Sequence, residues 1–268
     1  MRRVRPAAVA GTFYPDDPKT LAATVDRALA AARALAATRP PSAAPPKALV
    51  VPHAGYVYSG PVAAVAYAEL DPVRHAIRRV VLLGPSHHVA LDGLAASSAD
   101  AFDTPLGAVP IDAAARDTVQ TLGGVVVDDE AHAAEHSLEV QLPFLQRCLE
   151  RFALLPLVVG RASPAVVAAV LDAVWGGPET LVVVSSDLSH YHGYASARRL
   201  DAATAAAIVA ARPDAIGPEE ACGCHPLGGL LETVRRRGLA VRLLDLRSSG
   251  DTAGPRERVV GYGAFAVA

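Results

Sequence analysis

Histidines follow three apolar segments of the chain at short distance. Each segment is typical of a buried strand, and the pairs are Ala48–Val51 with His53, Arg79–Leu83 with His87, and Leu181–Val184 with His190. Ligands of open α/β sheets bind just past the carboxyl ends of the strands, and neutral imidazole is the commonest metal ligand in proteins. The sequence therefore predicts a site at one edge of a sheet, where several imidazoles meet.

His53 and His87 are the first candidates for metal ligands, because each lies so close to its strand that the scaffold can hold it rigidly. A single histidine after a strand is more often a loop residue that makes one hydrogen bond. Three such loops, together with the turn Cys222-Gly223-Cys224-His225, favour a metal site over that alternative. We expect His88 to point away from the metal, or to contact the residues that bind the metal.

Asp187, His190 and His136 are candidates for acid–base chemistry. Asp187 shares a loop with His190, and a carboxylate beside an imidazole orients the ring and raises its pKa. Asp187 could equally be a turn or helix-cap residue. His136 lies in Glu135-His136-Ser137 and could likewise be a helix-cap histidine.

Two of the three cysteines, Cys222 and Cys224, lie close together in the sequence. Three cysteines do not make a disulfide framework in a chain of 268 residues. In a reducing compartment the cluster indicates metal or redox chemistry, the alternative being one buried cysteine with an incidental neighbour. A structural zinc site would need two clustered ligand pairs, and no second pair of matching spacing is present.

Strands that alternate with helices are expected to position these residues. The alternation predicts an α/β fold, a three-layer α/β/α sandwich with a mostly parallel or mixed central sheet, in a single domain over residues 1–268. We expect Gly60-Pro61 to start a helix that runs to about Leu70, and one helix to follow His136, with leucines on one face. The proline-rich stretch Thr38–Pro46 indicates a stiff surface connection.

The composition limits the classes of function. The formal net charge is −2, which argues against a dedicated binder of nucleic acid or anionic membranes, and Arg235–Arg237 is typical of a solvated helix end. No apolar run approaches the roughly 20 residues that a membrane span needs. The apolar stretch after Met1–Arg5 is too short for a secretory signal. We therefore expect a cytoplasmic protein.

Motifs of two common enzyme classes are absent. The sequence has no G-x-S-x-G elbow. It also has no G-x-G-x-x-G after the first strand and no P-loop. An α/β-hydrolase triad and a nucleotide site therefore have no support.

Six short motifs follow one another in a fixed order and are spread along most of the chain. They are Ala10-Gly11-Thr12-Phe13-Tyr14-Pro15, Pro52-His53-Ala54-Gly55-Tyr56, Leu83-Gly84-Pro85-Ser86-His87-His88, Glu135-His136-Ser137-Leu138-Glu139, Ser185-Ser186-Asp187-Leu188-Ser189-His190 and Cys222-Gly223-Cys224-His225-Pro226. This ordered set resembles the Memo family, whose bacterial members are called AmmeMemoRadiSam system protein B. That family is similar in fold to the class III extradiol dioxygenases, non-haem Fe(II) enzymes that open catechol rings.

The resemblance implies a set of site residues. His53, His87 and Cys222 match the metal ligands of the family, Asp187 and His190 match residues beside the metal, and His136 matches a histidine that lines the active site of the dioxygenases. The dioxygenases use two histidines and a carboxylate, whereas a thiolate is softer and shifts the preference toward copper(I) or a different iron chemistry. The implied cofactor is thus Fe(II) or copper. Cys224 could also bind the metal, or pair with Cys222 on oxidation.

Three functions follow from these observations. The leading hypothesis is a metal-dependent oxidoreductase that performs redox chemistry of the dioxygenase type on a small molecule. The second is a binding or adaptor module that keeps the oxygenase fold without turnover. The third, suggested by the bacterial family name, is a partner of a radical-SAM protein in a modification pathway.

Overall fold

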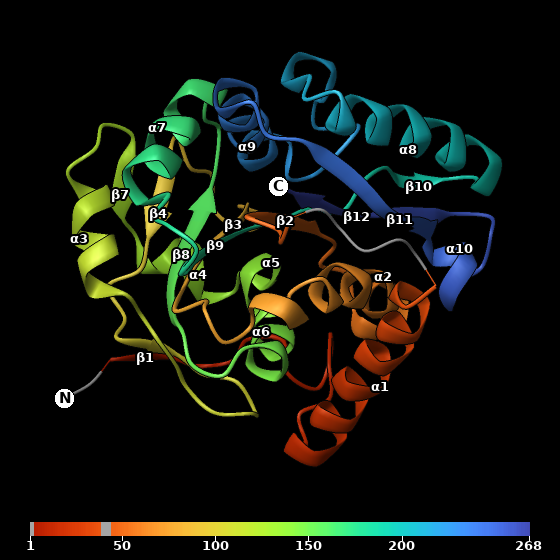
Figure 1. Ribbon diagram of the computed structural model, residues 1–268, viewed down its shortest axis with the longest axis horizontal. Coiled ribbons are helices and arrows are strands. Elements are labelled where there is room, and N and C mark those ends of the chain that lie inside the picture. The colour runs from red at the N-terminus through yellow and green to blue at the C-terminus, as the bar shows by residue number, and fades with distance from the viewer. Residues whose placement is uncertain (1–2, 39–43) are drawn as a thin grey trace.

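A mixed sheet of nine strands runs through the molecule, as the computed structural model shows for residues 3–38 and 44–268 (Figure 1). Eight strands follow one another in the order β10 (His190–His192), β12 (Val259–Val267), β2 (Ala48–Val51), β9 (Thr180–Ser185), β3 (Arg79–Pro85), β8 (Ala153–Val159), β4 (Leu94–Ala96) and β7 (Val125–Val127). The ninth, β11 (Val241–Ser248), pairs with β12. The central strands β2, β9, β3 and β8 are parallel, whereas β12 and β4 run antiparallel to β2 and β8.

Helices cover both faces of this sheet, which confirms the predicted α/β/α sandwich (Figure 1). One face carries α1 (Pro18–Ala36), α2 (Tyr56–Ala68), α5 (His136–Glu139) and α6 (Leu142–Cys148). The other carries α3 (Ala113–Gln120), α7 (Pro164–Val174), α8 (Tyr194–Val209) and α9 (Cys224–Arg237). The remaining elements are α4 (Asp129–Ala133), α10 (Ser249–Thr252), two short 3₁₀ turns (Asp71–Val73 and Pro213–Ala215) and a small sheet of β1 (Val4–Arg5), β5 (Ala101–Phe102) and β6 (Val109–Pro110).

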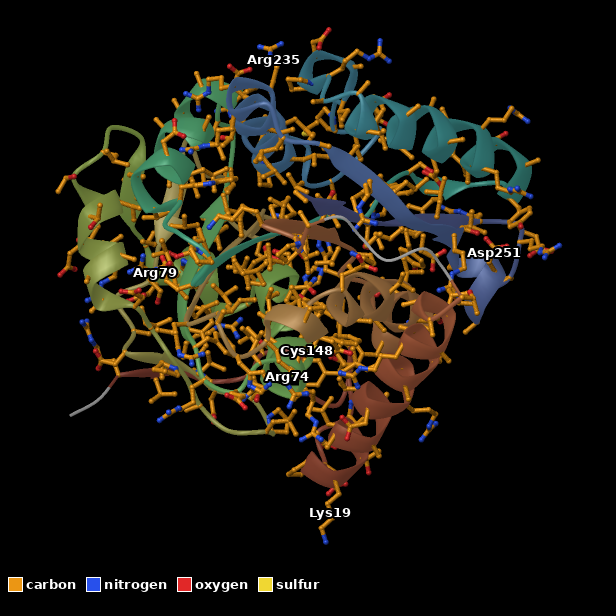
Figure 2. All side chains as sticks on the ribbon, in the orientation of Figure 1. Lys19, Arg74, Arg79, Cys148, Arg235 and Asp251 are labelled. Carbon is orange, nitrogen blue, oxygen red and sulfur yellow. The ribbon has the colours of Figure 1, made fainter. Side chains whose placement is uncertain are left out.

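Alternate residues of the central strands pack into two separate cores. In β2, Leu49 and Val51 belong to the core under α1 and α2, while Val50 belongs to the core under α7 and α9. All three are at most 1% exposed, as expected for parallel strands that are covered on both sides. Figure 2 shows Lys19 and Arg235 projecting from the molecule, whereas Cys148 is buried. The sheet is therefore a rigid base for the loops at its edges.

The helix boundaries show which local signals were reliable. Asp17 caps α1 by accepting a hydrogen bond from the Thr20 backbone N–H at 2.8 Å, and Ser163 caps α7. Each such cap contributes about 1 kcal/mol. Gly238, at φ +65°, ends α9 in the left-handed conformation that glycine adopts readily.

The predicted start of α2 at Gly60 is wrong, because the helix begins at Tyr56 and contains Pro61. Its first N–H is satisfied from outside, since Tyr56 N donates to the Phe13 carbonyl at 2.8 Å. The predicted helix after His136 is two helices, because α5 ends at Glu139 and α6 begins at Leu142. The connection predicted for Thr38–Pro46 includes residues 39–43, which lie outside the described residues, so that it stays a prediction.

Among the described helices, none has both the length and the apolar character that would let it cross a lipid bilayer.

Candidate metal centre

Three histidines meet at the carboxyl-terminal edge of the parallel strands. His53 follows β2, His87 follows β3 and His136 is the first residue of α5. The ring centroids are 5.2 Å apart for His53 and His87, 5.5 Å for His53 and His136, and 4.6 Å for His87 and His136. One nitrogen from each ring lies within 4.8 Å of the other two. The predicted convergence of imidazoles at one sheet edge is therefore confirmed for His53 and His87, and it includes His136.

Hydrogen bonds fix which nitrogen of His53 faces the site. His53 Nδ1 lies 2.9 Å from Ser185 Oγ. The Ser185 hydroxyl donates its only proton to the Ser137 carbonyl at 2.7 Å and accepts from the Gln141 amide at 2.8 Å. Ser185 Oγ must therefore accept a hydrogen bond from His53 Nδ1–H, so we assign the lone pair to Nε2. Burial, and then the neighbouring rings of His87 and His136, lower the pKa of His53 well below its usual range, which keeps the ring neutral.

A buried carboxylate, that of Glu135, orients the ring of His87. Glu135 Oε1 lies 2.9 Å from His87 Nδ1, and its Oε2 accepts a 2.7 Å hydrogen bond from the His87 backbone N–H. Burial favours the neutral acid, but the hydrogen bonds and charge of His87 and the Ser137 backbone N–H outweigh it and lower the pKa of Glu135. The ionised Glu135 holds Nδ1–H and leaves His87 Nε2 free, which is the usual arrangement behind a metal-binding histidine.

The position of His136 depends on close packing between α5 and β3. Any other residue in place of Gly84, in β3, would put a Cβ atom 2.5 Å from Ser137 Oγ. Because glycine has no Cβ atom, α5 can approach the strand closely. The His136 ring stacks on His87 and lies 4.6 Å from the Phe13 ring. Burial, and then the neighbouring His87, lower the pKa of His136 to about 4. His136 is therefore a neutral imidazole beside His53 and His87, with a ring nitrogen that could bind a metal ion.

The N-terminal segment is tied to the same helix through Glu139, which is fully buried. Its carboxylate pairs with Arg5, which is 7% exposed, and accepts hydrogen bonds from Tyr14 Oη at 2.5 Å and Val9 N at 3.0 Å. These contacts fix the segment that carries Phe13 against the metal centre. A buried charge of this kind is tolerable because every oxygen of the carboxylate has partners.

Cys222 lies beside His53, two residues before the start of α9. Its Sγ is 3.3 Å from His53 Nε2 and 3.6 Å from the Asp187 carbonyl oxygen. Burial, and then the charge of Asp187, raise the pKa of the Cys222 thiol to about 12, so a metal ion would have to displace its proton. Gly223 makes this approach possible, because a Cβ atom there would lie 2.9 Å from the carbonyl oxygen of Ser185.

The predicted acid–base residues Asp187 and His190 line the same cavity. Asp187 is 4% exposed, and its carboxylate accepts a 2.8 Å hydrogen bond from the His53 backbone N–H. Burial raises its pKa to about 7, and burial lowers the pKa of His190. Asp187 is thus neither a plain turn residue nor a helix cap, because it holds the His53 loop.

The cavity has a volume of about 730 Å³ and is lined by residues that the sequence analysis did not select. They include four aromatic residues, Phe13, Tyr58, Tyr191 and Tyr262, and one cation, Arg258. Phe13 lies in the first of the six ordered motifs and could have been found from that signal. The other four lie outside these motifs, and only the tertiary fold brings them together.

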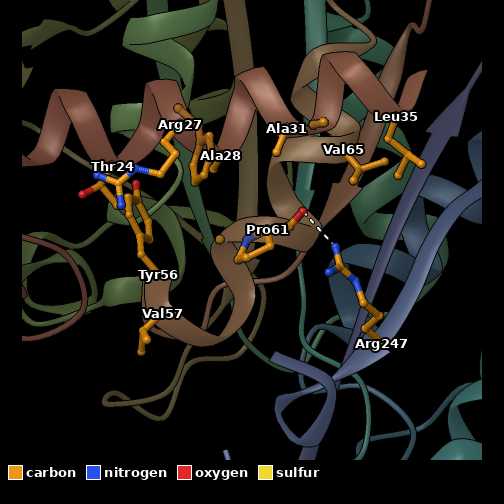
Figure 3. A pocket seen from close by; sticks show the side chains of 13 residues that line it. Thr24, Arg27, Ala28, Ala31, Leu35, Tyr56, Val57, Pro61, Val65 and Arg247 are labelled. Atoms are coloured by element: carbon orange, nitrogen blue, oxygen red, sulfur yellow. Dashed lines mark hydrogen bonds between the residues drawn. The ribbon is translucent and has the colours of Figure 1, made fainter. Parts of the chain in front are cut away.

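Other reactive side chains, and a second cavity, lie outside the histidine cluster. Cys224 is buried and is not among the residues that line this cavity. His88 is exposed, with its ring 6.1 Å from His136. A second cavity of about 430 Å³ lies between α1 and α2 (Figure 3). Its described lining is mainly apolar, with Arg247 donating to the Pro61 carbonyl, and includes no histidine, cysteine or carboxylate. The chemistry of the described residues therefore gathers at the histidine cluster.

The donor set at this cluster fits a metal ion. Three imidazoles present nitrogen atoms to one region, and Nδ1 of His53 and of His87 is held from behind by a hydrogen bond. The Cys222 thiol lies 3.3 Å from His53 Nε2, but Cys222 is not one of the three residues whose ligand atoms all lie within 4.8 Å of one another. The group could therefore hold a transition metal, for which imidazole and sulfur are suitable ligands.

Comparison with known proteins finds relatives along nearly the whole chain. A family model described as Memo-like protein matches residues 5–266. A MEMO1 family protein of Aeropyrum pernix is 36% identical, over 99% of this chain and 100% of that protein, and one of Aquifex aeolicus is 36% identical over 97% of each chain. An uncharacterized protein from Escherichia coli K12, known from a crystal structure, has the same fold with a TM-score of 0.51 at 15% identity, over 80% of this chain and 98% of that one. The chain therefore belongs to the Memo family.

Proposed function

We propose that this protein holds one ion of Fe(II) or copper on His53, His87 and Cys222 and performs redox chemistry of the dioxygenase type on a small molecule. The observation that carries the proposal is the convergence of His53, His87 and His136, two of them with an orienting hydrogen bond at Nδ1. Structural histidines do not need ring nitrogens that lie within 4.8 Å of one another beside an open cavity.

The third ligand is the point on which the metal's identity depends. Cys222 Sγ lies 3.3 Å from His53 Nε2, and a thiolate there would favour copper(I) or an iron chemistry unlike that of the two-histidine, one-carboxylate enzymes. His136 is the competing ligand, because its ring nitrogen belongs to the same cluster. Whichever of the two does not bind the ion would face the substrate next to it.

The remaining residues have separate roles in this proposal. When bound, the ion would supply the redox chemistry. Asp187 holds the His53 backbone in place, and His190, which lines the cavity, can take up or give a proton at its imidazole. The aromatic lining, including Phe13 packed on His136, gives the cavity an apolar surface beside the histidines.

A metal titration of matched variants tests the ligand set. Cys222→Ser removes the proposed sulfur ligand, and Cys224→Ser is its control two residues away. We expect Cys222→Ser to weaken binding of Fe(II) and copper(I), and Cys224→Ser to bind as the parent does. If His136→Gln weakens binding and Cys222→Ser does not, the third ligand is His136. Unchanged binding in both Cys222→Ser and His53→Ala would refute the site.

Oxygen consumption tests the reaction. The protein, loaded with Fe(II) or copper, is mixed with a panel of catechols in an oxygen electrode. We expect consumption with at least one catechol, and none with His53→Ala. A protein that binds the metal fully but consumes no oxygen across the panel would contradict the proposed reaction and favour a binding module that keeps the oxygenase fold.

A further inference from the structure

The pairing of β10 with β12 brings a tyrosine and an arginine together at the cavity. His190 pairs with Val260 and His192 with Val259, with a bulge between the two pairs at Tyr191. Arg258 immediately precedes β12. The Arg258 guanidinium carbon lies 5.1 Å from the centre of the Tyr191 ring, and both residues line the cavity of the histidine cluster.

Tyr191 is held in an unusual conformation. Its φ is +62°, which is uncommon for a bulky side chain, and it is 63% exposed. Strain of this kind persists only where the surrounding structure enforces it, and it is concentrated at functional sites. Here the bulge turns the aromatic ring toward the cavity lining instead of the core.

Arg258 brings a permanent positive charge to the cavity wall. Within residues 3–38 and 44–268, no carboxylate lies within ion-pair distance of it, whereas Arg33 and Arg242 pair with Asp71 and Glu69. A guanidinium stays protonated at all ordinary pH values. The only carboxylate among the described lining residues is Asp187, which is 4% exposed and already bonded to the His53 backbone. The charge of Arg258 is therefore available to a ligand.

Flat apolar surfaces complete this part of the cavity. Phe13, Tyr58 and Tyr262 line it together with Tyr191. Aromatic rings favour stacked or edge-on contact with another ring, and a guanidinium favours a carboxylate, which it can hold with two parallel hydrogen bonds. The Arg258 guanidinium also packs against the Tyr191 ring on one side.

We infer that the ligand of this cavity is a small planar carboxylate, whose ring lies against the aromatic lining and whose carboxylate is bound by Arg258. The inference rests on the proposed function in taking this cavity as the substrate site, and it names the class of substrate. Arg258, with Tyr191 beneath it, is then the residue that determines specificity.

Binding of benzoate and of benzamide, its neutral isostere, tests this inference. Both are measured on the metal-free protein by ligand-observed NMR, so that a metal ion cannot bind the carboxylate. The variants are Arg258→Gln, which removes the charge, Arg258→Lys, which keeps it, and Arg256→Gln. Arg256 is a matched control, because it lies 4.5 Å from the Tyr194 ring in the same segment but does not line the cavity.

We expect the parent and Arg256→Gln to bind benzoate about tenfold more tightly than benzamide, the effect of one charged hydrogen-bonded contact. Arg258→Gln should lose this preference, and Arg258→Lys should keep part of it. Equal binding of the two probes by the parent, no binding of benzoate at millimolar concentration, or an unchanged preference in Arg258→Gln would overturn the inference. Metal titration of the same proteins separates the two proposals. If the parent binds metal normally but shows no preference for benzoate, only the inference is refuted. If the parent prefers benzoate but binds no metal, only the proposed function is refuted.

Discussion

Replacing Glu135 by glutamine should weaken metal binding without removing a ligand. The carboxylate accepts a 2.9 Å hydrogen bond from His87 Nδ1 and is buried, with 1% of its side chain exposed. Hydrogen bonds to a charged group contribute about 1.5–3 kcal/mol, against about 1 kcal/mol for neutral partners. The loss of about 1–2 kcal/mol corresponds to a decrease in metal affinity of roughly 5- to 30-fold. This range overlaps the loss of about 10- to 100-fold that is typical when a partner behind a metal-binding histidine is removed.

The assay is competition for Co(II) or copper against a chelator of known affinity, with circular dichroism to confirm that the variant is folded. Glu135 also accepts hydrogen bonds from the His87 and Ser137 backbone N–H groups, one on each carboxylate oxygen, whereas glutamine has only one terminal oxygen that can accept. We therefore also expect a lower melting temperature. Glu130→Gln is the control, because Glu130 is exposed in the same segment. A folded Glu135→Gln protein that binds metal as tightly as the parent would refute the assignment of Glu135 as the residue that orients His87.

Three other predictions concern the packing around the site. Gly223→Ala should displace Cys222, because the new Cβ atom would lie 2.9 Å from a β9 carbonyl oxygen. We expect the free energy of unfolding, measured by urea denaturation, to fall by about 1–3 kcal/mol. An unchanged free energy of unfolding would contradict the close packing. Glu139→Gln leaves Arg5 buried without its counter-charge, which should cost about 3–5 kcal/mol in the same assay, and a loss below 1 kcal/mol would show that the pair is not buried in solution. Burial lowers the pKa of His132 from 6.5 to about 4, so the unfolded chain binds the proton at a higher pH than the folded protein does. The contribution of His132 to stability is therefore full above about pH 6.5 and falls by about 3 kcal/mol as the pH drops to 4. His132→Gln should remove that part of the pH dependence, and an unchanged pH profile of stability would refute the prediction.

The sequence predicted the sheet edge well because the signal there is local. An apolar run followed at once by a polar loop marks the end of a buried parallel strand, and His53 and His87 both lie just after such runs. Asp187 lies at the same edge, where its carboxylate accepts a hydrogen bond from the His53 backbone, a contact that the sequence did not predict. The place of a residue at the sheet edge depends on its own strand and could be predicted from the sequence.

Contacts between distant segments were not predictable in this way. Glu135 could be recognised only as a neighbour of His136, because its hydrogen bond to His87 spans 48 positions of the sequence. Arg258 and Tyr191 meet through the register of β10 and β12, and no local pattern sets that register. Pro61 was misread as the start of α2, because an external partner for Tyr56 N–H allows the helix to begin earlier.

The measurement that tests the central claim most directly is elemental analysis of protein purified without oxygen, beside His53→Ala and the control His75→Ala. His75 is a surface residue that pairs with Glu150 away from the cavity. We predict about one iron or copper ion per chain in the parent and in His75→Ala, and almost none in His53→Ala. Equal metal content in the parent and His53→Ala, or no iron or copper in protein that cannot be reloaded with either, would contradict the account.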